Sequence, residues 1–143
     1  MPTLNPPSID DAAETDTQSG VPRAAKKILI VDDDVVTARA LQVILRDAGY
    51  DAHSCHGGTA ALHAARKDPP HAALIDIHLP DLNGLILAQQ LRQLLGPDTP
   101  IIICSGDTSM ETLNSLPHVG ATFFFSKPLN RNALVERMKE WVP

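Results

Sequence analysis

The chain has 143 residues, with 43% hydrophobic and 3% aromatic content, so we expect one domain with an aliphatic core rather than two domains of ordinary size. The formal net charge is -5, but four acidic residues precede Arg23, and from Arg23 onward the 12 basic and 13 acidic residues nearly balance. A near-neutral domain argues against nucleic-acid binding, which needs a basic face.

Membrane insertion and secretion are not expected either. No stretch approaches the ~18 consecutive apolar residues of a membrane-spanning helix. The first twenty residues are acidic and lack the apolar segment of a signal peptide. Cys55 and Cys104 lie in apolar, strand-like contexts and are expected to be buried free thiols, as in proteins of reducing compartments. We therefore expect a cytoplasmic protein without a membrane span.

The N-terminal segment differs in composition from the rest. Residues 1–25 are polar and small, with prolines at positions 2, 6, 7 and 22. Such a segment buries too little apolar surface to offset the entropy lost on ordering. We predict a disordered acidic leader at 1–25 and a folded domain at 26–143.

Strand and helix patterns alternate through the folded domain. Short apolar runs predict strands, and periodic apolar residues predict helices between them. The expected strands are 28–31, 52–55, 72–75, 101–104 and 123–126. The first expected helix ends at Gly49, and the next three span 59–67, 85–95 and 109–116. Pro117 keeps the helix at 109–116 short. A fifth helix is expected after Asn130. This alternation predicts an α/β fold: a flavodoxin-like, doubly wound, five-stranded parallel sheet of order 2-1-3-4-5 with five helices.

Chemically useful residues follow four of the five strands. Asp32-Asp33-Asp34 follows the first, Asp76 the third, Ser105 the fourth and Lys127 the fifth. The carboxyl ends of parallel strands meet at one edge of the sheet, where ligands bind. We therefore expect these side chains to converge, with the binding crevice between Asp33 and Asp76.

The acidic residues at this edge predict a metal site. Carboxylates on adjacent strand ends repel one another, and Mg²⁺ prefers oxygen ligands of this kind. Asp32, Asp33 and Asp76 are the candidate ligands, and the backbone carbonyl of His78 is a further one. Mg²⁺ is therefore the expected cofactor.

A phosphoryl group is the ligand that suits the remaining residues. Asp76 is the best candidate nucleophile because it alone stands on the central third strand, and aspartyl phosphate is an established covalent intermediate. Lys127 and Ser105 would bind the phosphoryl oxygens. The backbone at Ile77 and Gly106 completes the expected phosphate-binding set.

The chain resembles the receiver domain of two-component response regulators, including the stand-alone chemotaxis type, in four segments: KKILIVDDD (26–34), LIDIHLPDLNG (74–84), IIICSGD (101–107) and FFFSKPL (123–129). The resemblance implies that Asp76 is phosphorylated by a sensor histidine kinase or a histidine phosphotransfer protein in a Mg²⁺-dependent reaction. It implies a signalling phosphoprotein that catalyses only its own phosphorylation and dephosphorylation, and so not an enzyme of metabolism. A cis peptide is expected at Lys127–Pro128.

The same resemblance implies a switch. Ser105 and Phe124 would move together on phosphorylation, changing the binding preference of the surface formed by the fourth helix, the fifth strand and the last helix. That surface would bind a downstream protein target, and a homodimer through it is compatible with the resemblance. His78 and Asp107 flank the path of attacking water in the family's geometry, so we hypothesise that they tune the lifetime of the phosphorylated form.

The chain ends at Pro143, directly after the last helix, which favours a single-domain regulator over one with an output domain, unless it is a fragment of something longer. Two other functions remain open. The first is a receiver fold used only as an interaction module without phosphorylation. The second is a phosphatase of the haloacid dehalogenase type, because Asp32 and Asp34 satisfy its D-x-D-x-T/V motif. That phosphatase would need further acidic ligands after Lys127 and would leave Asp76 without a role.

Overall fold

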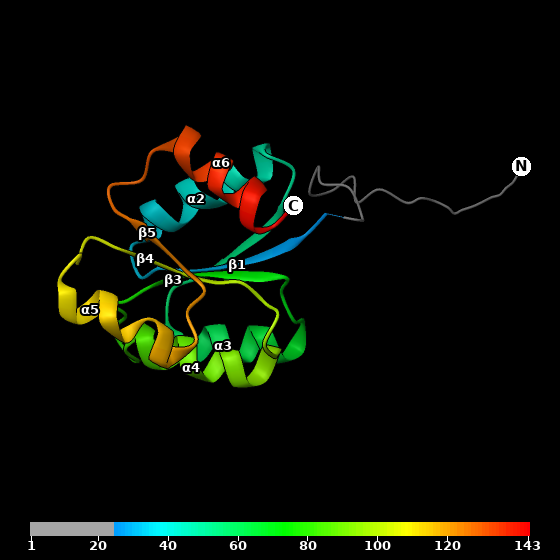
Figure 1. The fold of residues 1–143 in the computed structure, drawn as a ribbon. Coiled ribbons are helices and arrows are strands. Elements are labelled where there is room, and N and C mark those ends of the chain that lie inside the picture. The colour runs from blue at the N-terminus through cyan, green and yellow to red at the C-terminus, as the bar shows by residue number, and fades with distance from the viewer. Residues whose placement is uncertain (1–24) are drawn as a thin grey trace, which may run out of the picture.

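The computed structural model describes residues 25–143, and the prediction of a disordered leader falls almost entirely on residues 1–24, outside the described part. Strands and helices alternate along the described chain (Figure 1). The elements are β1 (Lys27–Val31), α2 (Val35–Asp47), β2 (Asp51–Cys55), α3 (Gly58–Lys67), β3 (Ala72–Asp76), α4 (Gly84–Leu95), β4 (Ile101–Ser105), α5 (Met110–Ser115), the 3-10 turn η1 (Pro117–Val119), β5 (Phe123–Ser126) and α6 (Arg131–Trp141).

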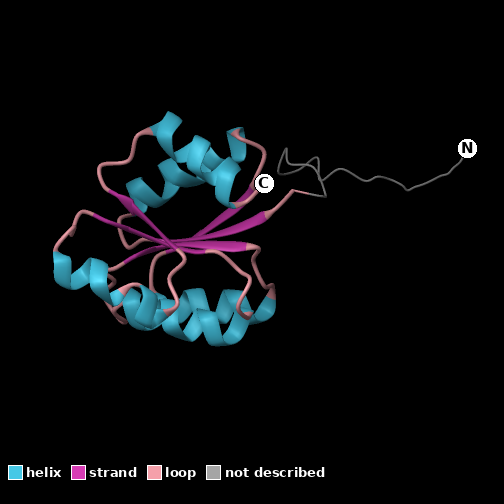
Figure 2. Ribbon diagram, viewed as in Figure 1, coloured by secondary structure: helices cyan, strands magenta, loops and turns pink. Residues whose placement is uncertain are grey.

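The five strands form one parallel sheet in the order β2-β1-β3-β4-β5. Helices α2 and α6 cover one face, and α3, α4 and α5 lie on the other (Figures 1 and 2). This arrangement confirms the predicted α/β fold, its strand order and its five helices. The order reverses between β1 and β3, which places a crevice at the carboxyl ends of these two strands.

Two apolar clusters explain why the inner strands are continuous apolar runs. Alternate side chains of a strand point to opposite faces of the sheet. Ile28 and Ile30 of β1 therefore belong to the cluster under α2 and α6, whereas Leu29 and Val31 belong to the cluster under α3 and α4. Strands buried on both faces need apolar residues at every position.

Helix α4 turns only part of its leucine-rich sequence toward the sheet. Leu94, in the last turn of the helix, is 41% exposed. The buried positions are Gly84, Leu87, Ala88 and Leu91, spaced i, i+3, i+4 and i+7. The rotation of α4 is set by Gly84, because this residue packs against the end of β3.

The contact at Gly84 is a backbone contact. Its N–H donates to the carbonyl of Ile77 at 2.8 Å. A Cβ at this position would overlap the carbonyl oxygen of Asp76 and lie 2.6 Å from Cα of Ile77. The side chain of Asn83 caps the same helix by accepting a hydrogen bond from the N–H of Leu85 at 2.8 Å. Glycine at 84 therefore lets α4 begin directly against the strand end that carries Asp76.

The fourth helix is short, as Pro117 predicts. Helix α5 spans Met110–Ser115 and buries none of its residues. Pro117 then begins the 3-10 turn η1, which was not predicted from the sequence. Proline suits this position because the first residue of a helix has no intrahelical partner for its N–H, so the N–H that proline lacks is not missed. Helix α5 itself is consequently held by less packing than the helices α3 and α4 on the same face.

We predict that Gly84→Ala destabilises the protein by about 1–3 kcal/mol, because the added methyl group forces the end of β3 away from α4. Denaturant unfolding followed by circular dichroism measures this change. Gly106→Ala is the matched control, since a Cβ there meets no atom within 4 Å, and its effect should stay within about 0.5 kcal/mol. Equal stabilities of the two variants would contradict the proposed contact.

Candidate functional site

The carboxyl ends of four strands bring the predicted residues to one edge of the sheet. Asp76 and Ser105 are the last residues of β3 and β4, and Asp32 and Lys127 directly follow β1 and β5. The N–H of Lys127 donates to the carbonyl of Ser105 at 2.9 Å, and the Lys127–Pro128 peptide is cis, as expected. The convergence follows from the parallel sheet.

Three carboxylates and one ammonium form the centre of this edge. Oxygen atoms of Asp32, Asp33 and Asp76 all lie within 4.8 Å of one another. Asp32 and Asp76 are only 2% and 8% exposed, whereas Asp33 is exposed. Lys127 Nζ lies 2.9 Å from Asp32 Oδ2 and 3.6 Å from Asp76 Oδ2. One positive charge thus faces three negative charges, and the cluster keeps an excess of negative charge.

The pKa values of Asp76 and Lys127 are both raised in this cluster. Burial raises the pKa of Asp76, and the neighbouring charges of Asp32 and Asp33 raise it further against the opposing effect of Lys127. Burial alone would lower the pKa of Lys127, but the hydrogen bond to Asp32 and the charges of Asp32 and Asp76 raise it above its usual range. Each group therefore holds its proton more tightly than it does in water.

The acidic cluster fits a divalent cation. All three side chains offer oxygen donors, which Mg²⁺ prefers, and their spacing allows them to share one ion. A bound cation would also offset the charge that Lys127 leaves uncompensated. The N–H of His78 donates to Asp76 Oδ1 at 3.3 Å, so the backbone that would supply a further oxygen lies beside the cluster.

Ser105 is brought to the edge but is turned to a different partner. Its side chain is completely buried, and its Oγ accepts a hydrogen bond from the N–H of Asp107 at 3.0 Å. Within residues 25–143, no hydrogen bond joins this hydroxyl to the acidic cluster. The hydroxyl keeps its own hydrogen, because in this bond it acts as acceptor.

Asp107 organises the loop that follows Ser105. Its carboxylate accepts hydrogen bonds from the N–H of Ser109 at 3.0 Å and from the hydroxyl of Thr112 at 2.8 Å. These bonds, with a smaller contribution from His78, lower the pKa of Asp107. The carboxylate is thus engaged in holding the start of α5.

The other predicted residues surround this centre. His78 and Gly106 are exposed, and Ile77 is buried. Phe124 is half-buried, pairs in register with Ile103 of β4 and packs against the apolar cluster under α3 and α4. Its ring is therefore part of the core boundary next to the strand that ends at Ser105.

Asp34 has a structural role that goes against the phosphatase alternative. Its side chain caps α2, accepting hydrogen bonds from the N–H of Val36 at 3.1 Å and from the hydroxyl of Thr37 at 2.8 Å. These bonds lower its pKa. The dehalogenase-type motif needs Asp32 and Asp34 together at the reacting centre, and here only Asp32 belongs to the acidic cluster.

Asp81 positions the loop after Asp76, a role that was not predicted from the sequence. Its two carboxylate oxygens accept hydrogen bonds from the N–H groups of Thr59 at 3.0 Å and Gly58 at 2.9 Å, at the start of α3. These bonds lower the pKa of Asp81 to about 2. The capped helix begins far upstream in the chain, so no local pattern around Asp81 signals the contact.

Comparison with known proteins assigns the chain to a family. Residues 28–139 match the response regulator receiver domain. The chain belongs to the response regulator receiver domain family. The acidic cluster, the lysine and the buried serine hydroxyl all lie within the matched residues.

Solved structures show the same fold. A CheY-like receiver domain protein from Methanospirillum hungatei has a TM-score of 0.78 at 32% identity, covering 82% of this chain and 93% of that one. The chemotaxis protein CheY4 of Vibrio cholerae has a TM-score of 0.79 at 29% identity, covering 83% and 100%. Both neighbours are matched over nearly their whole length.

Curated relatives are longer than this chain. The DNA-binding response regulator MtrA of Mycolicibacterium paratuberculosis is 33% identical over 114 residues, which are 80% of this chain and 50% of the relative. The sensory/regulatory protein RpfC of Xanthomonas campestris is 27% identical over 117 residues, 80% of this chain and 16% of the relative. The chain therefore spans half or less of these two proteins.

None of the helices in residues 25–143 combines the length and hydrophobicity that crossing a bilayer requires.

We predict that Asp76→Asn is more stable than the native protein at pH 7 without Mg²⁺. The raised pKa means that the folded state binds the proton more tightly than the unfolded chain does. The unfolding free energy of the native protein should therefore fall as pH rises from the ordinary aspartate value, about 3.9, through the raised value. Asparagine is neutral throughout and escapes this loss.

Thermal unfolding in EDTA between pH 3 and pH 8 measures the difference. The midpoint of Asp76→Asn should exceed the native one by several degrees at pH 7, and the two should converge near pH 3. Asp33→Asn, which removes an exposed carboxylate, should give a smaller gain. A difference that does not change with pH would contradict the charge-crowding explanation.

Proposed function

We propose that this chain accepts a phosphoryl group on Asp76 from the phosphohistidine of a sensor histidine kinase or of a histidine phosphotransfer protein. One observation carries the proposal: a nearly buried carboxylate at the end of the central strand has an ammonium 3.6 Å away and two further carboxylates beside it. Family membership supports the same function. In this proposal the chain is a signalling phosphoacceptor and acts only on its own phosphoryl group.

The transfer needs few protein groups. An Oδ atom of Asp76 forms a bond to phosphorus while the donor's P–N bond breaks, and the electron pair returns to the donor imidazole. Lys127 Nζ lies between Asp32 and Asp76 in the unphosphorylated structure, and it would pair with the phosphoryl oxygens during transfer. The backbone N–H groups at Ile77 and Gly106 are the further proposed donors.

Mg²⁺ is the proposed cofactor, held by Asp32, Asp33, Asp76 and the carbonyl of His78. When bound, the ion neutralises phosphoryl charge and lets the anionic carboxylate approach phosphorus. The protein supplies the oxygen ligands, and two of the three carboxylates, those of Asp32 and Asp76, are largely shielded from solvent. The negative excess left by a single lysine explains why the site would require this ion.

The output in this proposal is a shift in population at the surface formed by α5, β5 and α6. Ser105 can donate its free hydroxyl hydrogen to a phosphoryl oxygen, and Phe124 on the adjacent strand would follow that movement. No residue of α5 is fully buried, so less packing opposes its displacement than that of α3 or α4. The partner would be a downstream protein or a second copy of the chain, and no nucleic acid is proposed as a ligand.

The first test is intact mass after incubation with acetyl phosphate. We expect one added phosphoryl group on the native protein in the presence of Mg²⁺, and no addition when EDTA replaces Mg²⁺. Asp76→Asn should remain unmodified, because its amide is not a nucleophile toward phosphorus. An adduct of equal yield on Asp76→Asn would assign the acceptor to another residue.

A second experiment addresses the lifetime of the phosphorylated form. We propose that His78 shields Asp76 from water more than Asp107 does, because the carboxylate of Asp107 is held by Ser109 and Thr112. His78→Ala should therefore speed dephosphorylation by about threefold or more. His118→Ala, which removes an exposed histidine on η1, is the control. An unchanged rate in His78→Ala would end this part of the proposal.

A further inference from the structure

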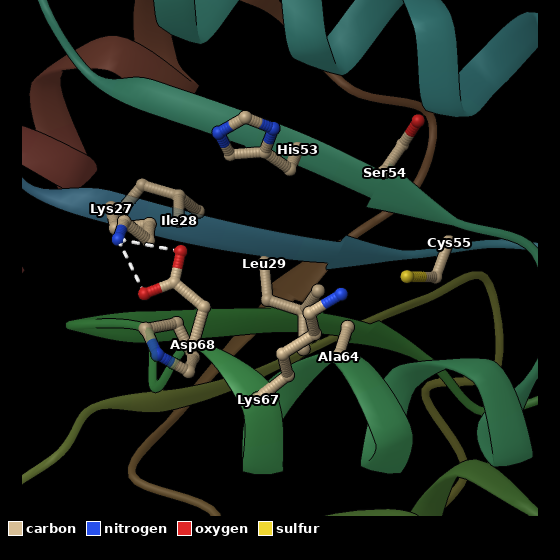
Figure 3. Close-up of a pocket in the computed structure, with 10 residues that line it drawn as sticks. Lys27, Ile28, Leu29, His53, Ser54, Cys55, Ala64, Lys67 and Asp68 are labelled. Carbon is tan, nitrogen blue, oxygen red and sulfur yellow. Dashed lines mark hydrogen bonds and ion pairs between the residues drawn. The ribbon is translucent and has the colours of Figure 1, made fainter.

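A groove away from the acidic cluster lies between strands β1 and β2 and helix α3 (Figure 3). Its volume is about 500 Å³, within the range of small-molecule pockets. Its lining includes Lys27, Leu29, Cys55, Ala64, Lys67 and Asp68. Strand β2 is the edge of the sheet, so the groove opens at the side of the molecule.

The groove exists because the face of α3 that is turned to the sheet carries small residues. Ala61 and Ala65 are completely buried against the sheet, and Ala64 lines the groove. Methyl groups leave space beneath the edge strand that larger side chains would fill. Leu29 of β1 points into this space, and the thiol of Cys55 borders it (Figure 3). Burial raises the pKa of Cys55, so this thiol is uncharged and adds to the apolar floor.

The charges around the groove are unequal. Lys27 Nζ donates to both carboxylate oxygens of Asp68, at 2.7 and 2.8 Å, and this neutral pair forms one wall. His53 pairs with Asp51 at 2.8 Å. In the described part of the chain no ion pair joins Lys67 to a carboxylate, although its ammonium lies over the groove (Figure 3). Of the two lysines that line the groove, Lys27 is therefore paired and Lys67 is not, and the carboxylate of Asp51 beside His53 is the further charge at its edge.

We propose that this groove binds a small organic anion with an apolar body and a single carboxylate. The apolar body lies on Leu29 and Ala64, where it removes apolar surface from water. The carboxylate accepts a hydrogen bond from Lys67 Nζ, and such charge-assisted bonds fix the orientation of the ligand. A neutral analogue lacks the second contact, and a cationic one is repelled by Lys67.

The groove is distinct from the site around Asp76. None of its lining residues belongs to the acidic cluster or to the phosphate-binding set. One backbone contact nevertheless links the two sites: the carbonyl of Cys55, which lines the groove, accepts a hydrogen bond from the N–H of Asp32 at 3.1 Å. Binding at the groove does not require phosphorylation, so Asp76→Asn should retain it.

Sodium octanoate is the probe, and backbone amide shifts in ¹H–¹⁵N NMR spectra of the full chain are the readout. We expect saturable shifts centred on Leu29, Cys55 and Lys67. Octylammonium, with the same tail and the opposite charge, should produce no saturable shifts there. Lys67→Gln should weaken octanoate binding about tenfold, the loss expected for one charge-assisted bond.

Arg66→Gln is the matched control, because it removes one positive charge from the same exposed helix turn without lining the groove. It should bind octanoate within about twofold of the native protein. The proposal fails if octanoate shifts no groove amides, if octylammonium shifts them equally, or if Lys67→Gln binds like the native protein. Failure of the acetyl phosphate experiment would leave this test unaffected, since Asp76 takes no part in it.

Discussion

The structure depends on an imbalance of charge at one edge of its sheet. Lys127 lies 2.9 Å from Asp32 and 3.6 Å from Asp76, yet it faces three carboxylates and cannot neutralise them all. Placing anions this close together costs free energy unless another positive charge joins them. In the proposed function a divalent cation would offset this cost, because the three carboxylates offer the oxygen ligands that Mg²⁺ prefers. The protein would then be more stable with the ion than without it.

The rest of the fold holds the strand ends in place. The inner strands are buried on both faces, so the residues at their carboxyl ends have little freedom to move apart. Gly84 brings α4 against the carbonyl of Asp76, and Asp81 ties the following loop to α3. On the β4–β5 side, no residue of α5 is fully buried. One half of the edge is thus rigid, and the other half can change its arrangement at low cost.

Local patterns were sufficient for most of the fold and for the centre of the site. The apolar runs before Asp32, Asp76 and Ser105 require strands buried on both faces, and parallel strands bring their ends together. Contacts between distant segments were not predictable in this way. Asp81 caps a helix that begins 23 residues earlier, and nothing in its own neighbourhood indicates this. The exposure of Leu94 depends on the rotation that Gly84 imposes, which periodicity alone does not determine.

The most direct measurement is ¹⁹F NMR of the protein with beryllofluoride, a stable mimic of the phosphoryl group. The charge-imbalance account predicts bound fluorine resonances that appear only when Mg²⁺ is present and that are lost in Asp76→Asn. Lys127→Gln should bind beryllofluoride more weakly than the native protein, because the ammonium that pairs with the fluorine atoms is then absent. Bound resonances without Mg²⁺, or their persistence in Asp76→Asn, would contradict the account. The protein would then be a receiver fold whose acidic edge serves another ligand.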